Sequence, residues 1–229
     1  MLIRIIVLCT IILCPSICWG EVSLGKVAID PGHGGYDPGA IRQGIMEKQI
    51  NLEIAFEVEK ILKQNNVDVI LTRYGDYNHA VPGLRKKEAK RYDFERRIDF
   101  ARNFDADIMV SIHCNVGRRR CMGPETFYYG KSVQGKLLAE QIQRELHKIP
   151  GIGKRSYKPG SYYILTRTSM PCVIIEMGFI NNPEERKLLM GQEYRHVLAK
   201  ATADGIIEYL KIKRNSETET KSLQNTNYQ

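Results

Sequence analysis

Three side chains capable of metal binding or proton transfer each follow a short apolar run that is typical of a buried strand. His33 follows the run 26–29, His113 ends the run 107–113, and Glu176 ends the run 171–176. The carboxyl ends of strands in a wound sheet lie along one edge, where ligands bind. Glu47 begins a predicted helix, and the glycine-containing loop 34–46 brings it back from the same edge. We therefore expect all four side chains at one edge of one sheet.

The types of these four residues define a chemistry. Two imidazoles and one carboxylate form the ligand set of a catalytic zinc site with an open fourth position. A remaining carboxylate can then take a proton from water and pass it to a leaving amine. Each residue alone has a simpler interpretation: a turn or core histidine for His33 and His113, and a helix-dipole partner for Glu47. Glu176 is harder to explain in this way, because carboxylates are rarely buried without a partner.

The elements that must position these residues alternate between strand and helix signals, which predicts one α/β domain over residues 26–213 without repeats. Residues 47–64 carry an apolar stripe at helical spacing, and residues 73–92 are predicted to form a long polar loop. The predicted strands are 26–29, 68–72, 107–113, 125–129, 161–165 and 171–176, and the predicted helices are 47–64, 93–103, 132–148, a short one from Pro183, and 192–213.

The two ends of the chain differ from this domain in composition. Residues 1–20 have the basic start, apolar centre and small-x-small end of an export signal, with an uncleaved anchor as the alternative. Residues 214–229 are polar and without pattern, which predicts a disordered tail. From residue 21 onward the formal charge is +7, because one arginine is lost from a chain of +8. This charge indicates either a solvated basic surface or attraction to an anionic wall polymer, and the absence of aromatic-interleaved basic stripes argues against nucleic acid.

Three cysteines follow residue 20, namely Cys114, Cys121 and Cys172. An odd number argues against a complete disulfide framework. Isolated thiols are the favoured interpretation, and a Cys114–Cys121 bridge is the alternative.

The order and spacing of several motifs resemble those of the zinc-dependent N-acetylmuramoyl-L-alanine amidases of the type 3 family. They extend over about residues 26–210 and begin with Asp-Pro-Gly-His-Gly-Gly at 30–35. The others are Glu47-Lys48, Thr72-Arg73, Arg96, Ser-Ile-His-Cys-Asn at 111–115, Glu-Met-Gly-Phe at 176–179 and Asn182-Pro183. Size, the basic segment 83–97 and Phe-Tyr-Tyr-Gly-Lys at 127–131 resemble in particular the CwlD-type spore-cortex amidases of spore-forming bacteria.

This resemblance implies a twisted mixed sheet of about six strands flanked by helices. It implies one Zn²⁺ ion on His33, Glu47 and His113, with Glu176 as the catalytic acid/base. The substrate would be peptidoglycan, cut between N-acetylmuramic acid and L-alanine, in spore cortex on the way to muramic-δ-lactam and germination. The enzyme would be exported and would meet a membrane only through its N-terminal segment.

Further roles follow less directly from the resemblance. Arg73, Arg96 and Asn115 are candidate substrate-binding residues, and surface ion pairs are an equal alternative for the two arginines. Because no wall-binding repeats or inhibitory insertion are appended, targeting and activation would come from a partner protein of lipoprotein type. The alternatives for function are a zinc deacetylase or peptidase acting on the same wall, and a metal-free wall-binding or regulatory protein of the same fold.

Overall fold

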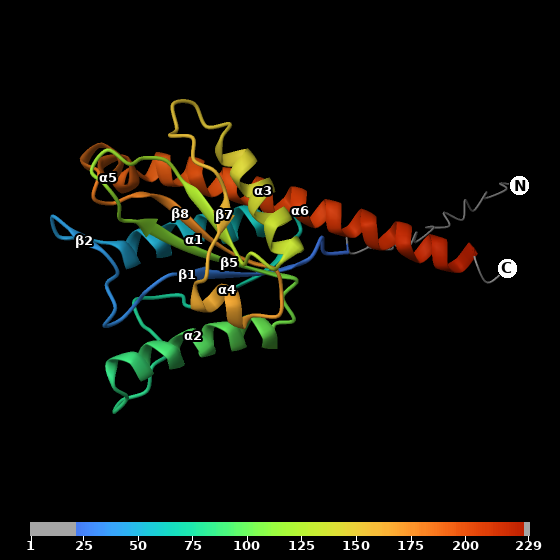
Figure 1. The fold of residues 1–229 in the computed structure, drawn as a ribbon, viewed down its shortest axis with the longest axis horizontal. Coiled ribbons are helices and arrows are strands. Elements are labelled where there is room, and N and C mark those ends of the chain that lie inside the picture. The colour runs from blue at the N-terminus through green and yellow to red at the C-terminus, as the bar shows by residue number, and fades with distance from the viewer. Residues whose placement is uncertain (1–21, 227–229) are drawn as a thin grey trace, which may run out of the picture.

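The computed structural model describes residues 22–226, which form a six-stranded sheet between two layers of helices (Figure 1). The strand order is β4-β1-β5-β8-β6-β7. The first four run parallel, β6 is antiparallel to β8, and β7 is parallel to β6. The strands are β1 (Lys26–Pro31), β4 (Asp68–Leu71), β5 (Ile108–Asn115), β6 (Glu125–Tyr128), β7 (Lys158–Pro159) and β8 (Cys172–Phe179). The expected α/β domain with a six-stranded mixed sheet is therefore confirmed.

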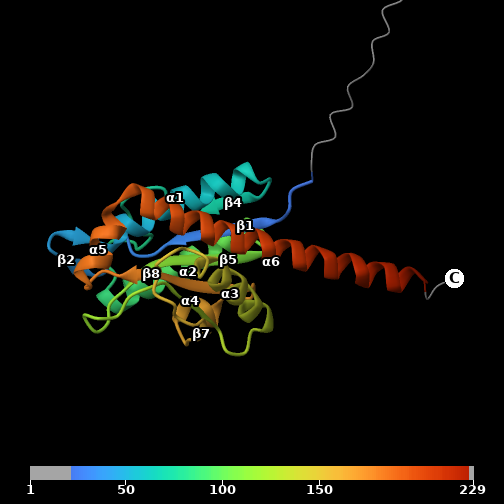
Figure 2. The same ribbon diagram turned by 90° about the horizontal axis from the view of Figure 1, so that it is seen from above.

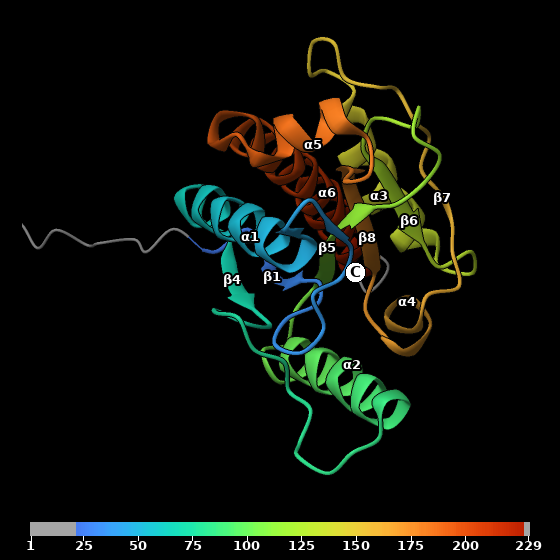
Figure 3. The same cartoon turned by 90° about the vertical axis from the view of Figure 1, so that its left-hand side faces the viewer.

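One face of the sheet is covered by three long helices, and the other by two. Figure 3 shows α1 (Glu47–Gln64), α6 (Gln192–Thr226) and α3 (Val133–Leu146) on one side, and α2 (Lys86–Asn103) and α4 (Tyr163–Arg167) on the other. Helix α6 packs against both α1 and α3, and the short α5 (Pro183–Met190) precedes it. The central strands β1, β5 and β8 are apolar on both faces because both are covered.

The loop between β1 and α1 carries a small hairpin of β2 (Ile41–Arg42) and β3 (Ile45–Met46). This hairpin returns the chain to Glu47, the first residue of α1. The predicted boundaries of α1 are the observed ones. Ser132 caps α3 as predicted, its hydroxyl accepting from the N–H of Gly135 at 2.9 Å.

Helix α2 begins at Lys86, which corrects the prediction of a loop up to residue 92. Its inward positions include the polar side chains Asp93 and Arg97, so the first turns carry no apolar periodicity to detect. The helix starts where the Glu88 carboxylate accepts from the backbone N–H of Arg85 at 3.2 Å. The first turns of α2 are buried through polar side chains, so the sequence shows no apolar stripe there.

The segment predicted as a strand at 161–165 is not one: residues 163–165 begin helix α4 (Tyr163–Arg167), and the two residues before them precede the helix. Tyr162, Tyr163 and Ile164 favour strands by propensity. Packing overrides that preference, because one helical turn buries Ile164 and Leu165 against the second face of the sheet.

The C-terminal helix α6 continues to Thr226 and does not end at 213 as predicted (Figure 2). Its last part extends away from the sheet, and the side chains described there are solvent-exposed. Lys213 Nζ lies 3.7 Å from Glu217 Oε1 one turn later, and the Thr218 hydroxyl donates to the carbonyl of Arg214. Local contacts of this kind support a polar helix without a buried stripe.

The predicted export signal at 1–20 lies outside the described residues. Within residues 22–226, the structure contains no helix with the length and apolar character needed to cross a membrane.

Candidate active site

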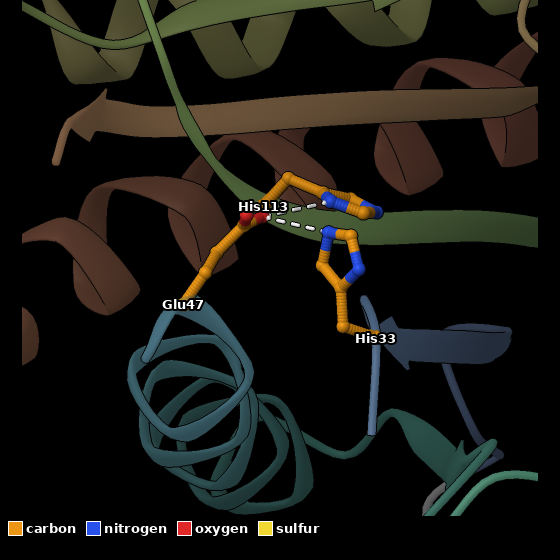
Figure 4. A group of neighbouring side chains, drawn as sticks. All are labelled: His33, Glu47 and His113. Carbon is orange, nitrogen blue, oxygen red and sulfur yellow. Dashed lines mark hydrogen bonds and ion pairs between the residues drawn. The ribbon is translucent and has the colours of Figure 1, made fainter. Parts of the chain in front are cut away.

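Two histidines and a glutamate from three separate elements meet at the carboxyl edge of the sheet (Figure 4). His33 lies in the loop after β1, Glu47 starts α1, and His113 lies near the end of β5. Glu47 Oε1 is 3.1 Å from His33 Nε2 and 3.1 Å from His113 Nδ1. One ligand atom from each side chain lies within 4.8 Å of the other two, so the group can hold a metal ion.

The loop that carries His33 depends on a close approach between backbone and ring. A Cβ atom on Gly32 would lie 2.2 Å from the His113 ring, so only glycine fits there. His33 itself has a φ of 63°, a left-handed conformation that costs energy for a residue with a side chain. The fold therefore maintains a strained backbone at His33, a candidate metal ligand.

Glu47 is buried and receives several donors besides the histidines. Its Oε2 accepts from the N–H of Ala40 at 2.8 Å, and its Oε1 accepts from the N–H of Cys114 at 3.1 Å. Burial raises the pKa of Glu47, but the hydrogen bonds and charges of His113 and His33 outweigh this and lower it. The side chain is therefore an anion held in one orientation, as a metal ligand requires.

Asp37, which is not among the predicted site residues, lies beside the metal-binding group. Its Oδ2 lies 3.0 Å from His33 Nδ1, on the side of the ring opposite Glu47, and 3.5 Å from Lys90 Nζ. Burial lowers the pKa of His33, yet Asp37 and Glu47 together raise it to about 9. A carboxylate at the second nitrogen fixes the orientation of a ligating imidazole. The available signal was an aspartate four residues after His33 in the same glycine-rich loop.

Glu176 lies on β8 directly beside His113 of β5 in the sheet register. Its Oε2 atom is buried and has no hydrogen-bond partner within residues 22–226. Burial raises the pKa of Glu176, the nearby histidines oppose this and the charge of Glu47 adds to it, so the pKa lies at about 7. A carboxyl group that titrates near neutrality can both accept and return a proton.

The predicted substrate residues lie in different surroundings. Arg73 is fully buried and donates to the carbonyls of Pro31, Gly32, Lys48 and Gly75 at 2.7–3.0 Å. It holds the loops in place and does not face a substrate, which corrects that prediction. Asn115 ends β5 two residues beyond His113 and is partly exposed.

Arg97, and not the predicted Arg96, contacts the loop that carries His33. Arg96 is partly exposed and pairs with Asp99 at 3.4 Å, as the ion-pair alternative proposed. Arg97 is buried and donates to Asp30, Asp93 and the carbonyls of Pro31 and His33. The usable signal was helical spacing, because Arg97 lies four residues before the inward-facing Ala101.

A cavity of about 350 Å³ adjoins the two histidines on the α2 and α4 side of the sheet. Phe94, Tyr162, Tyr163 and Ile164 form its apolar wall, and Lys90 stands at its rim. Phe94 and Tyr163 stack with ring centroids 5.7 Å apart. The arrangement provides a metal-binding group, a neutral-range carboxyl and a pocket for one arm of a substrate, which suits hydrolysis of an amide.

Comparison with known proteins agrees with this chemistry. The model of the Amidase_3 family, N-acetylmuramoyl-L-alanine amidase, matches residues 27–208. The chain belongs to this family. It is an N-acetylmuramoyl-L-alanine amidase that acts on peptidoglycan, and membership implies action outside the cytoplasm.

Three individual matches span most of both chains. The germination-specific N-acetylmuramoyl-L-alanine amidase of Bacillus subtilis is 32% identical over 195 residues, covering 83% of this chain and 82% of that protein. The CwlD amidase of Clostridioides difficile, solved in complex with the GerS lipoprotein, matches with a TM-score of 0.78 and 32% identity, over 82% of this chain and 99% of that one. The amidase AmiC2 of Nostoc punctiforme matches with a TM-score of 0.72 and 33% identity, over 83% and 99%.

Proposed function

We propose that this amidase uses one Zn²⁺ ion held by His33, Glu47 and His113, with Glu176 as its catalytic acid/base. The observation that carries the proposal is the convergence of the three ligand atoms within 4.8 Å, with Glu176 on the adjacent strand. Two nitrogens and one oxygen match the ligand preference of catalytic zinc and leave a coordination position open. The unpartnered Oε2 of Glu176 supports its assignment as acid/base. A buried carboxyl oxygen without a donor destabilises the fold, and a catalytic role explains why such an atom is retained.

The residues of the chain divide the work of hydrolysis. When bound, zinc supplies a Lewis acid that polarises the scissile carbonyl and makes water more acidic. Glu176 takes a proton from the attacking water and delivers it to the amine of L-alanine as the C–N bond breaks. Asp37 keeps the His33 ring in position from its far side. Asn115, at the end of β5, is proposed to contact the substrate.

We extend the proposal to spore cortex, where removal of the peptide from muramic acid would precede formation of muramic-δ-lactam. The similarity to a germination-specific amidase and to CwlD, each at 32% identity, supports this role. The CwlD structure contains the GerS lipoprotein, which supports a lipoprotein-type partner for targeting or activation here. Export through residues 1–20 fits an enzyme that works on the wall.

The test is hydrolysis of teichoic-acid-free peptidoglycan by zinc-loaded protein, followed by mass spectrometry. We expect stem peptides that begin with L-alanine, and their loss on chelation. Glu176→Gln should retain zinc and release no peptide, whereas His113→Ala should lose both. Acetate or shortened peptides would indicate a deacetylase or a peptidase instead, and an active Glu176→Gln variant would refute the role of Glu176.

A further inference from the structure

A strongly basic surface lies beside the active site and takes no part in the chemistry derived above. Its core is three consecutive exposed arginines, Arg118, Arg119 and Arg120, in the loop between β5 and β6, with Lys154 in the loop after α3. No ion pair with a carboxylate of residues 22–226 is formed by any of these four. They line a depression of about 710 Å³, to which Arg155 also contributes. We call these four residues and Arg155 the basic surface.

The arginine loop is held firmly from beneath. Asn181 exchanges two hydrogen bonds with the backbone of Gly117, at 2.9 and 2.7 Å. The Asn182 amide donates to the carbonyl of Cys121 at 3.0 Å, and Glu185 accepts from the N–H of Gly123 at 2.7 Å. The backbone of the loop is therefore fixed by the turn after β8 and by the first turn of α5, while its arginines face solvent. Such preorganisation reduces the entropy lost on binding.

The second loop is joined to the first by close backbone contact. Gly123 has a φ of 91°, and a Cβ atom there would lie 1.8 Å from the carbonyl oxygen of Gly153. This contact places Lys154 beside the arginines. Arg155 is tied down as well, because it shares the buried carboxylate of Glu125 with Lys158. The cations of two distant segments thus form one continuous surface.

The position of the basic surface relates it to the metal-binding group. Glu125 pairs with Glu176 across β6 and β8, and Glu176 pairs with His113 across β8 and β5. Strands lie about 4.8 Å apart, so the Arg155–Glu125 pair is roughly 10 Å from the strand of His113. In Figure 1 the loop between β5 and β6 reaches the left-hand end of the molecule, where α1 begins. A polymer cut at the metal can therefore reach these cations.

We infer that the basic surface binds stem-peptide carboxylates of the same peptidoglycan, away from the bond that is cut. This inference rests on the proposed function, because it names a second contact for that substrate. Peptidoglycan repeats carboxylates along its length, and unpaired guanidinium groups bind carboxylates with two parallel hydrogen bonds. The depression is lined by four arginines and one lysine beside Cys121, Met122 and Gly153. This density of cations suits a polymer that repeats carboxylates along its length. It would retain the enzyme on the polymer between cuts.

The experiment measures sedimentation with teichoic-acid-free sacculi in the Glu176→Gln background, which prevents digestion. The test variant is Arg118→Gln/Arg119→Gln/Arg120→Gln. The matched control, Lys60→Gln/Lys211→Gln/Arg214→Gln, removes three exposed charges from the opposite end of the domain. We expect the test variant to bind about tenfold more weakly at low salt and to lose most of its salt dependence, while the control binds like its parent.

Two further measurements identify the ligand. Amidation of the sacculus carboxylates should weaken binding of the parent to the level of the arginine variant. With Glu176 intact, the arginine variant should cleave a soluble muramoyl-peptide bearing one stem at the parental rate. Unchanged binding to sacculi would overturn the inference, as would loss of binding only to vesicles containing phosphatidylglycerol. A parent enzyme that binds through the arginines but releases no peptide would instead count against the proposed function.

Discussion

Replacement of Arg97 tests whether a buried guanidinium supports the loop that carries His33. Arg97 bonds to Asp30 at 2.8 Å, to Asp93 at 2.9 Å, and to the carbonyls of Pro31 at 2.8 Å and His33 at 2.7 Å. Its side chain is 1% exposed. Arg97→Met leaves the buried Asp30 without its cation, and breaking such a pair costs about 3–5 kcal/mol. Because a domain is stable by about 5–15 kcal/mol, we expect a large but measurable loss of stability.

The chain provides a control one residue away. The Arg96 side chain is 43% exposed and meets Asp99 at 3.4 Å, so Arg96→Met should cost only about 0–1 kcal/mol. Arg97→Lys keeps the charge but loses the forked geometry, and should fall between the two. The assay is urea unfolding of the metal-free proteins at pH 7, with circular dichroism as the signal. If Arg97→Met and Arg96→Met agreed within about 1 kcal/mol, the buried network would not have the importance assigned to it.

Three further predictions concern the metal, the response to acid and the thiols. Asp37→Asn should bind zinc about 10–100-fold more weakly in chelator competition, because it orients His33, and unchanged affinity would contradict that role. Burial raises the pKa of Asp30, but Arg97, Ser111 and Thr72 lower it from 3.8 to about 2. Its folded-state pKa is thus depressed, so about 2 kcal/mol of stability is present above pH 4 and lost as the pH falls toward 2. Urea unfolding across this range should show a loss about 2 kcal/mol smaller in Asp30→Asn than in the parent, because other carboxylates with lowered pKa values, such as Glu47, titrate in both proteins. Cys114 and Cys172 are buried with raised pKa values, whereas Cys121 is partly exposed, so peptide mapping after brief alkylation should find Cys121 modified first.

Apolar periodicity and strand-end chemistry predicted the frame of this protein well. Helix α1 has the boundaries that its stripe indicated, and β1, β5 and β8 were located because runs buried on both faces are continuous and apolar. The same reasoning brought His33, Glu47, His113 and Glu176 to one edge, where the structure places them. Strand ends converge by topology alone, so no contact had to be known in advance.

Two of the misses share a physical cause, which is polar burial. The first turns of α2 pack through charged side chains, and Arg73 appeared to be a surface group although it is fully buried. Hydrophobic patterns do not report such positions, because the burial depends on partners distant in sequence. Asp37 lies only four residues from His33, but no sequence pattern shows that its carboxylate meets the ring, and only the fold brings the two together. The local sequence predicts the role of residues 30–35, but it does not predict which distant side chains hold that loop in place.

The two buried arginines, Arg73 and Arg97, supply hydrogen-bond donors to the glycine-rich loop after β1. After β1 the chain turns away from its ladder, so the carbonyls of Pro31, Gly32 and His33 need other donors while buried. Arg73 and Arg97 supply them, and both reach the Pro31 carbonyl. Guanidinium groups suit this task because each offers five donors from a rigid plane. The strained backbone of His33 is thus held by charges from β4's following loop and from α2, and the metal-binding geometry depends on residues that would never touch the substrate.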